Sequence, residues 1–150
     1  MVQPGGVTTY LNPVTIGLCN AGLGDTEIAS WKTSQFKTIY LRCGDSKSGY
    51  VHIRARHEMD WKNKLTSTGG SGNWDDFMLF ATSQAISGPT PGYPTNEGSN
   101  KWCYTTPIQI KKNGVVINTF RPTIIVSSST KRVLTSYPTG SAPNCSGSQD

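Results

Sequence analysis

The chain has 150 residues, of which 14 are basic and 9 acidic, giving a formal net charge of +5, and 35% of its residues are hydrophobic. This length fits one domain, residues 1–150, with a core of ordinary size. No apolar run approaches the length of a membrane span. The first residues lack the basic and apolar regions of a signal peptide. We therefore expect either a secreted protein whose signal has been removed or a module cut from a longer chain.

The N-terminal third carries weak local signals. Residues 1–25 are rich in Gly, Pro, Thr and Asn, which predicts an irregular lead-in with at most one short strand. Residues 26–35 can form a short helix through Ile28 and Trp31. Residues 36–42 are apolar and β-branched enough for a strand or for the end of that helix.

Residues 49–61 hold both histidines of the chain, His52 and His57, together with Arg54 and Arg56. As a strand, the segment places His52 on one face with both arginines, and as a helix it places His52 one turn before Arg56. Both interpretations put a histidine beside an arginine. Arginine offers a planar fork of donors to phosphate oxygens, and histidine exchanges a proton near neutral pH. The alternative is a solvated cationic face with an incidental histidine.

A loop at residues 66–72 and a helix are expected next. Asn73 can cap this helix, and Gly88 followed by Pro89 would end it. Residues 88–101 contain three prolines and predict a second loop. The helix would place a set of apolar residues on one face at helical spacing: Trp74, Phe77, Met78, Ala81 and Ala85.

From residue 102 the pattern changes to strands. Ile108 and Ile110 alternate with polar residues, and Asn113-Gly114 predicts a tight hairpin turn before a strand at residues 115–120. Residues 123–128 and 132–137 predict a second strand pair. The expected fold class is α+β: N-terminal helices packed on a four-stranded antiparallel meander, with the core at residues 26–139 and a flexible tail at residues 140–150.

The charge is unevenly distributed. Residues 98–149 contain six bases and no acid, and residues 47–64 contain five bases and two acids. Two basic regions that converge would form a patch that attracts a polyanion, most commonly nucleic acid. The alternative is a merely soluble basic protein.

The four cysteines, Cys19, Cys43, Cys103 and Cys145, include no C-x-x-C pair, which argues against a zinc knuckle. An even count, with one cysteine in a Ser/Gly/Asn/Pro-rich tail, suggests two disulfides and an oxidising compartment. Three connectivities are open, and we favour the pairs that are neighbours in sequence, Cys19–Cys43 and Cys103–Cys145. Four free thiols are the alternative.

The candidate catalytic residues do not match a known metal-binding or cofactor-binding motif. His57-Glu58 opens like the zinc-protease pattern H-E-x-x-H, but Trp61 stands at the position of the second histidine. There is also no Walker loop and no G-x-S-x-G. The hypothesis that is left is metal-free cleavage of RNA, in which the substrate's own 2′-hydroxyl is the nucleophile. Histidine, arginine and hydroxyl groups suffice to move the protons and stabilise the charge.

Two motifs resemble those of bacterial polymorphic toxin nucleases. Gly-Tyr-Val-His-Ile-x-x-Arg-His at residues 49–57 resembles their His-Ile-x-x-Arg-His helix, and Val-Leu-Thr-Ser-Tyr-Pro-Thr at residues 133–139 resembles their final strand. The residues from Trp74 onward resemble their second helix, and residues 124–126 their penultimate strand. The resemblance covers residues 49–139 and leaves 1–48 unmatched. Ser136 replaces a commoner alanine, and cysteines are unusual for a toxin that acts in a reducing cytosol.

These toxins belong to the barnase–EndoU–colicin–RelE-like group of metal-independent ribonucleases. The resemblance implies an endoribonuclease, with tRNA among the candidate targets, that leaves a 2′,3′-cyclic phosphate. It further implies a monomer that is secreted, or delivered into a target cell's cytoplasm as the C-terminal module of a larger toxin, and that is neutralised by an acidic immunity protein. The catalytic residues would be His52, His57, Arg56, Thr135 and Tyr137, and the RNA-binding residues Arg54, Arg121, Ser136 and Lys62.

The ribonuclease interpretation carries one geometric expectation and has one competing function. On a helix, His52 and His57 differ by about 140° around the axis, so they cannot both point into one cleft unless the helix end lies at its edge. The competing function is a secreted, disulfide-stapled binding module for glycans, surfaces or nucleic acid, without catalysis.

Overall fold

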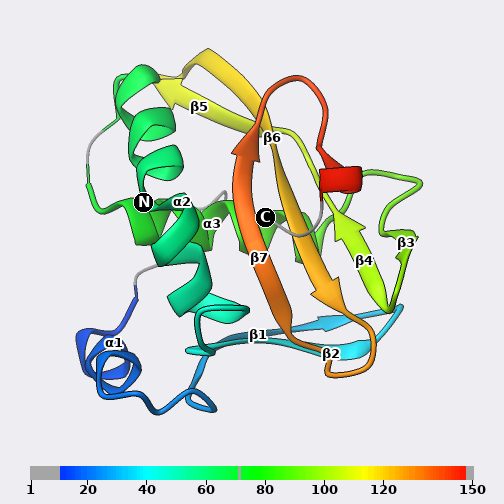
Figure 1. Cartoon of the computed structure of the whole chain (residues 1–150). Helices are drawn as coiled ribbons and strands as arrows, with labels where there is room; N and C mark the ends of the chain where they lie inside the picture. The colour runs from blue at the N-terminus through cyan, green and yellow to red at the C-terminus, as the bar shows by residue number, and fades with distance from the viewer. Residues whose placement is uncertain (1–10, 71, 148–150) are drawn as a thin grey trace.

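The computed structural model of the chain describes residues 11–70 and 72–147, and Figure 1 shows their arrangement. Three helices and seven strands are present in these residues, followed by one short 3₁₀ turn. They are α1 (Pro13–Asn20), β1 (Glu27–Thr33), β2 (Lys37–Arg42), α2 (Gly49–Ser67), α3 (Trp74–Ser87), β3 (Thr95–Gly98), β4 (Lys101–Tyr104), β5 (Ile108–Lys112), β6 (Val115–Ser127), β7 (Val133–Thr139) and η1 (Cys145–Gly147).

The irregular lead-in expected over residues 1–25 is wrong for α1, while residues 1–10 lie outside the described residues. The helix begins after Asn12, whose side chain accepts a hydrogen bond from the Val14 backbone N–H at 2.9 Å. Pro13 stands at the first helical position, where it costs no hydrogen bond. A disulfide from Cys19 then ties this short helix to the body, so tertiary attachment outweighs its weak local pattern.

The helix expected over residues 26–35 is also wrong, because this segment forms β1 and pairs with β2 in an antiparallel hairpin. Trp31 lies opposite Ile39 in this register. Of the two alternatives for residues 36–42, the strand is present as β2, in which Ile39 and Leu41 are fully buried. The helix was predicted from Ile28 and Trp31 alone, which are three residues apart and cover only one helical turn. Such a short pattern stabilises a helix less than pairing with β2 and its buried side chains stabilises a strand.

Residues 49–67 adopt the helical alternative as α2. Its first residue, Gly49, has a φ of +82°, and a Cβ there would lie 2.7 Å from the Arg42 carbonyl oxygen. Only glycine allows this close approach of the helix start to β2. The helix continues to Ser67, so the loop expected from residue 66 starts later. The α3 prediction is confirmed, with Phe77, Met78, Ala81 and Ala85 buried.

The expected antiparallel sheet is present, but with five strands instead of four and a separate two-stranded sheet, β1–β2. Strand β3 lies in the predicted proline loop and pairs with β4. Strand β6 is one long strand where two were predicted, and it pairs with β7 on one side. Strands β4 and β5 follow each other along β6 in one register, with Tyr104 opposite Ile124 and Ile108 opposite Phe120.

Pro122 explains why β6 can run unbroken through a proline. In the register that β4 and β5 share, it lies opposite residues 105–107, the connection between the two strands. No ladder hydrogen bond is needed from its missing N–H there. Its carbonyl still accepts a 2.6 Å hydrogen bond from the Thr105 hydroxyl, which closes the gap.

Both favoured disulfides are present, Cys19–Cys43 and Cys103–Cys145. The first joins α1 to the residue that follows β2, and the second joins the C-terminal tail to β4. The described part of the tail, expected to be flexible, is therefore covalently tied to the sheet. Two disulfides are compatible with a secreted protein. None of the helices in the described residues is long and apolar enough to cross a membrane.

Helix α2 packs beside β7, and the two elements run in the same direction (Figure 1). Trp61 of α2 is fully buried, and its indole N–H donates to the Ser136 carbonyl of β7 at 3.0 Å. The same ring makes edge contacts with Phe77 of α3 and Phe120 of β6, at centroid distances of 5.4 and 6.2 Å. Trp61 therefore joins α2, α3 and the sheet.

We expect Trp61→Phe to lower the free energy of unfolding by roughly 1–3 kcal/mol, because the buried Ser136 carbonyl loses its donor. Urea unfolding measured by circular dichroism tests this. Trp31→Phe is the matched control, since Trp31 is only half-buried in β1, and its loss should be smaller. Equal losses for both variants would contradict a special role for the Trp61 indole.

Candidate active site

The two histidines lie together on the inner side of α2. Each is only 6% exposed, and their ring centroids are 6.0 Å apart at 74°. Two side chains about 140° apart on a helix can point into one cleft only where the helix end lies at its edge. This condition is met, because His52 lies in the first turn of α2. From there its ring converges on the same place as that of His57.

Strand β7 supplies the hydroxyl groups on the other side. The His57 ring stacks on Tyr137 with centroids 4.8 Å apart and an interplanar angle of 25°. Thr135 lies two residues earlier on the same face of β7. Because α2 and β7 run in parallel, the rise of about 7.5 Å from His52 to His57 matches the rise of about 6.6 Å from Thr135 to Tyr137. Thr135 therefore lies before Tyr137 along β7, toward the N-terminal end of α2 that carries His52.

Hydrogen bonds orient both imidazole rings. His57 Nδ1 lies 2.8 Å from Asp60 Oδ2, and His52 Nδ1 lies 2.9 Å from the Ser46 carbonyl oxygen. A carboxylate and a carbonyl only accept, so Nδ1 carries the proton in both rings and the lone pair of the neutral ring is on Nε2. Sequence reasoning missed both partners. The three-residue spacing of His57 and Asp60 could have found Asp60, whereas Ser46 depends on the fold of a loop.

The two arginines of α2 have different surroundings. His52, Arg56 and Asp60 follow each other at four-residue intervals and form one row along the helix. Arg56 is exposed within that row, beside the histidines. Arg54 instead donates to the Asn20 side-chain oxygen at 2.7 Å, at the end of α1. Of the two arginines, the structure thus brings Arg56 into the row of His52.

The other three predicted RNA-binding residues have contacts elsewhere. Ser136 is fully buried, and its hydroxyl meets that of Thr82 in α3 at 2.8 Å. Arg121 donates to the Thr90 hydroxyl at 2.9 Å, in the loop after α3. Lys62 forms an ion pair with Glu58 at 2.5 Å and lines a hollow between the end of α2 and the start of α3.

Tyr50 is a second buried tyrosine near this helix, but it has a structural partner. Its hydroxyl donates to Asp75 Oδ2 at 2.9 Å, and its ring stacks on Trp74. Burial, followed by the Asp75 carboxylate, raises the pKa of Tyr50 well above its ordinary value. Tyr50 therefore stays protonated and links α2 to α3, and we assign it no acid–base role.

The candidate site thus combines His52, His57 and Arg56 of α2 with Thr135 and Tyr137 of β7. Among the described residues, no group of three or more His, Cys, Asp or Glu side chains is placed to hold a metal ion. Comparison with protein-family models and with curated proteins finds no significant match for this chain. The chemistry of the site is therefore inferred from its own residues.

Proposed function

We propose that the protein is an endoribonuclease that cleaves RNA without a metal ion. The observation that carries this proposal is the contiguous group of two oriented histidines and Tyr137, with centroid distances of 6.0 and 4.8 Å. One general base and one general acid are what 2′-hydroxyl attack requires. Exposed Arg56 in the same helical row supplies the positive charge.

In the proposed reaction, His57 takes the proton of the RNA 2′-hydroxyl through Nε2, and the 2′-oxygen attacks the adjacent phosphorus. Asp60 stabilises the imidazolium that forms. The 5′-oxygen leaves with a proton from His52, which yields a 2′,3′-cyclic phosphate and a 5′-hydroxyl. Arg56, Thr135 and Tyr137 donate to the phosphate oxygens, where charge develops in the transition state.

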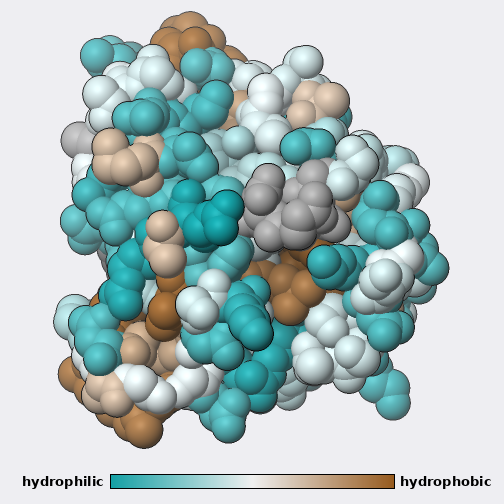
Figure 2. All heavy atoms as spheres, in the orientation of Figure 1, coloured by the Kyte–Doolittle hydropathy of each residue, from teal (hydrophilic) through white to brown (hydrophobic). Residues whose placement is uncertain are grey.

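The charge distribution supports a polyanionic substrate. Residues 98–149, which include β4 to β7, contain six bases and no acid. In Figure 2 the face over α2 is mostly hydrophilic, and some apolar surface lies near the centre of the view. Further apolar surface lies at two places, the tip of the β5–β6 hairpin and around α1. Exposed apolar side chains at these two places include Val115, Val116, Val14 and Leu18. The polar surface over α2, which includes exposed Arg56, suits the phosphates of RNA.

We also propose a toxin role for this ribonuclease, with a monomer acting on RNA such as tRNA in a target cell. An active ribonuclease endangers the cell that makes it, so a neutralising partner is needed. The net charge of +5 favours an acidic immunity protein. Two disulfides are compatible with secretion, either of the chain itself or of a larger toxin that carries it as its C-terminal module.

A secreted binding module without catalysis is the second candidate. The two disulfides and three half-buried tryptophans, Trp31, Trp74 and Trp102, favour it, because such rings can stack on sugars. Trp61 is fully buried and is not available to a ligand. RNA cleavage separates the two candidates directly.

We expect the purified protein, assayed with and without a thiol reductant, to cleave RNA in excess EDTA. The reason is that base, acid and charge stabilisation all come from side chains. End-group analysis of the fragments should find 2′,3′-cyclic phosphates. Loss of cleavage in EDTA and its recovery on adding Mg²⁺ or Zn²⁺ would overturn the mechanism.

The histidine variants His52→Ala and His57→Ala should each lose about 10²–10⁴-fold in cleavage rate, because each removes a proton-transfer group. His57→Ala should cost the same as His52→Ala or less. Met59→Ala is the matched control on α2, since this side chain is 61% exposed, and its rate should be near normal. Near-normal rates for both histidine variants, confirmed folded by circular dichroism, would refute the site.

Affinity for single-stranded RNA should fall steeply with salt, with log K decreasing by about 0.7 per log unit of salt for each phosphate neutralised. Fluorescence anisotropy with labelled RNA and the His52→Ala variant measures binding without cleavage. A slope near zero would contradict binding through the basic regions at residues 47–64 and 98–149.

A further inference from the structure

The candidate site is closed in this structure. His52 and His57 are each 6% exposed, Thr135 is 2% exposed, and Tyr137 is 7% exposed. A phosphodiester must reach these side chains within hydrogen-bond distance for proton transfer to occur. A ribonuclease with this geometry therefore needs a part that moves away before RNA can bind.

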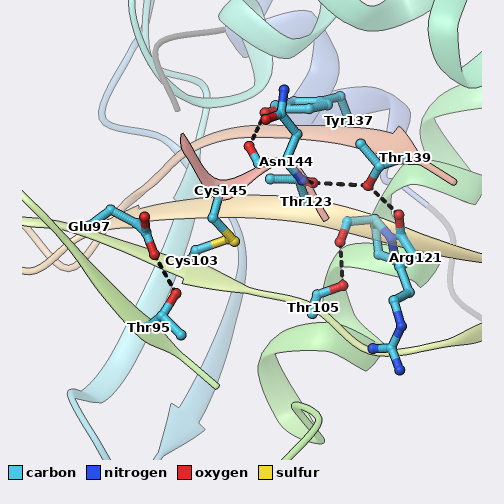
Figure 3. Close-up of a disulfide and its surroundings, with 11 residues drawn as sticks. Thr95, Glu97, Cys103, Thr105, Arg121, Thr123, Tyr137, Thr139, Asn144 and Cys145 are labelled. Atoms are coloured by element: carbon cyan, nitrogen blue, oxygen red, sulfur yellow. Dashed lines mark hydrogen bonds between the residues drawn. A yellow bond between two sulfur atoms is a disulfide. The ribbon is translucent and has the colours of Figure 1, made fainter. Parts of the chain in front are cut away.

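The C-terminal tail covers one member of the site, the Tyr137 hydroxyl. Figure 3 shows Asn144 lying over Tyr137 and Thr123 of the β6–β7 pair. The Tyr137 hydroxyl donates to the Asn144 carbonyl at 3.0 Å, and the Asn144 N–H donates to the Thr123 hydroxyl at 2.9 Å. A hydroxyl has one proton to donate. While Asn144 accepts this proton, Tyr137 cannot donate it to a phosphate.

Besides the Cys103–Cys145 disulfide, the tail is held by the two hydrogen bonds of Asn144 and by one backbone hydrogen bond, which the Arg121 N–H donates to the Gly140 carbonyl at 2.9 Å. Residues 140–147 are Gly, Ser, Ala, Pro, Asn and Cys, with no large apolar side chain to pack on the sheet. Most of residues 140–146 are exposed or half-buried. The Cys103–Cys145 bond anchors the segment immediately after Asn144, on β4, where Cys103 is fully buried opposite Ile125.

We propose that residues 140–147 form a redox-sensitive strap over the ribonuclease site, locked by Cys103–Cys145 and released by a dithiol reductant. This inference rests on the proposed function. A thiolate of the reductant attacks the sulfur of half-buried Cys145, and Cys103 leaves as a thiolate and takes up a proton. The second thiol of the reductant then frees Cys145 as a thiol, so the reductant becomes the disulfide and the protein gains two electrons and two protons.

The strap gives the disulfide a role in a protein that acts on intracellular RNA. In an oxidising compartment the bond persists, and the site stays covered. In a reducing cytosol the bond opens, and the two remaining hydrogen bonds of Asn144 compete with water, where each contributes only about 0.5–1.5 kcal/mol. Activity then appears in the target cell and not outside it.

The test compares RNA cleavage by the full chain in three forms: oxidised, reduced with dithiothreitol, and oxidised Cys103→Ser/Cys145→Ser. The oxidised wild type should be at least about tenfold slower, because activity follows the fraction of open molecules. The double variant should be active without reductant and gain nothing from it. Cys19→Ser/Cys43→Ser is the matched control, because it lacks the other disulfide, keeps the strap and should still be activated by dithiothreitol.

Amide hydrogen exchange of residues 140–147 gives a readout besides activity, and it should speed up in the reduced protein and in the double variant. If Cys103→Ser/Cys145→Ser does not fold, Cys145→Ala and the reduced wild type can be compared with the oxidised wild type in its place. Equal cleavage by all forms, or unchanged exchange of the tail, would overturn the strap and leave the ribonuclease standing. Absence of cleavage in every form would overturn the ribonuclease proposal and the regulation with it.

Discussion

The contact of α2 with β7 through Trp61 is the constraint on which the site depends. The Trp61 indole N–H bonds to the Ser136 carbonyl, and its ring is enclosed by Phe77 and Phe120. This contact sets how far α2 slides along β7. His57 lies one helical turn before Trp61 and therefore reaches Tyr137, the residue after Ser136. A shift of α2 by one turn would separate the imidazole from the hydroxyl groups.

The surroundings of the histidines combine orientation with closure. Asp60 and the Ser46 carbonyl settle which ring nitrogens carry protons, and such partners usually decide whether an imidazole can act in catalysis. The Asn144 carbonyl accepts the hydrogen bond of the Tyr137 hydroxyl, whereas the proposed cleavage of RNA needs access to that hydroxyl. In the proposed strap, a segment of small residues is held by one disulfide and a few hydrogen bonds. Its release would reconcile these two demands, because breaking the disulfide would open access to Tyr137.

Much of the fold could be predicted from local patterns. The apolar face of α3 and the Asn113-Gly114 turn depend on neighbouring residues alone, and both are present. The misses, α1, β1 and β3, are short elements whose stability comes from distant partners: a disulfide for α1, and pairing with β2 and β4 for the strands. The continuity of β6 through Pro122 likewise depends on a gap in the opposite strand.

The sequence by itself determined the chemical types available: two histidines next to arginines on one stretch, a Thr-Ser-Tyr strand, an acid-free basic region at residues 98–149 and four cysteines. It left three pairings of the cysteines open, and the structure contains the favoured one. Only the tertiary structure decided that the two histidines lie together, that His57 stacks on Tyr137, that Arg54 bonds to Asn20 instead, and that Asn144 accepts the proton of the tyrosine hydroxyl. The physical reason is range, since helical and strand periodicity act over a few residues, whereas these contacts join residues up to 80 positions apart, from His57 to Tyr137.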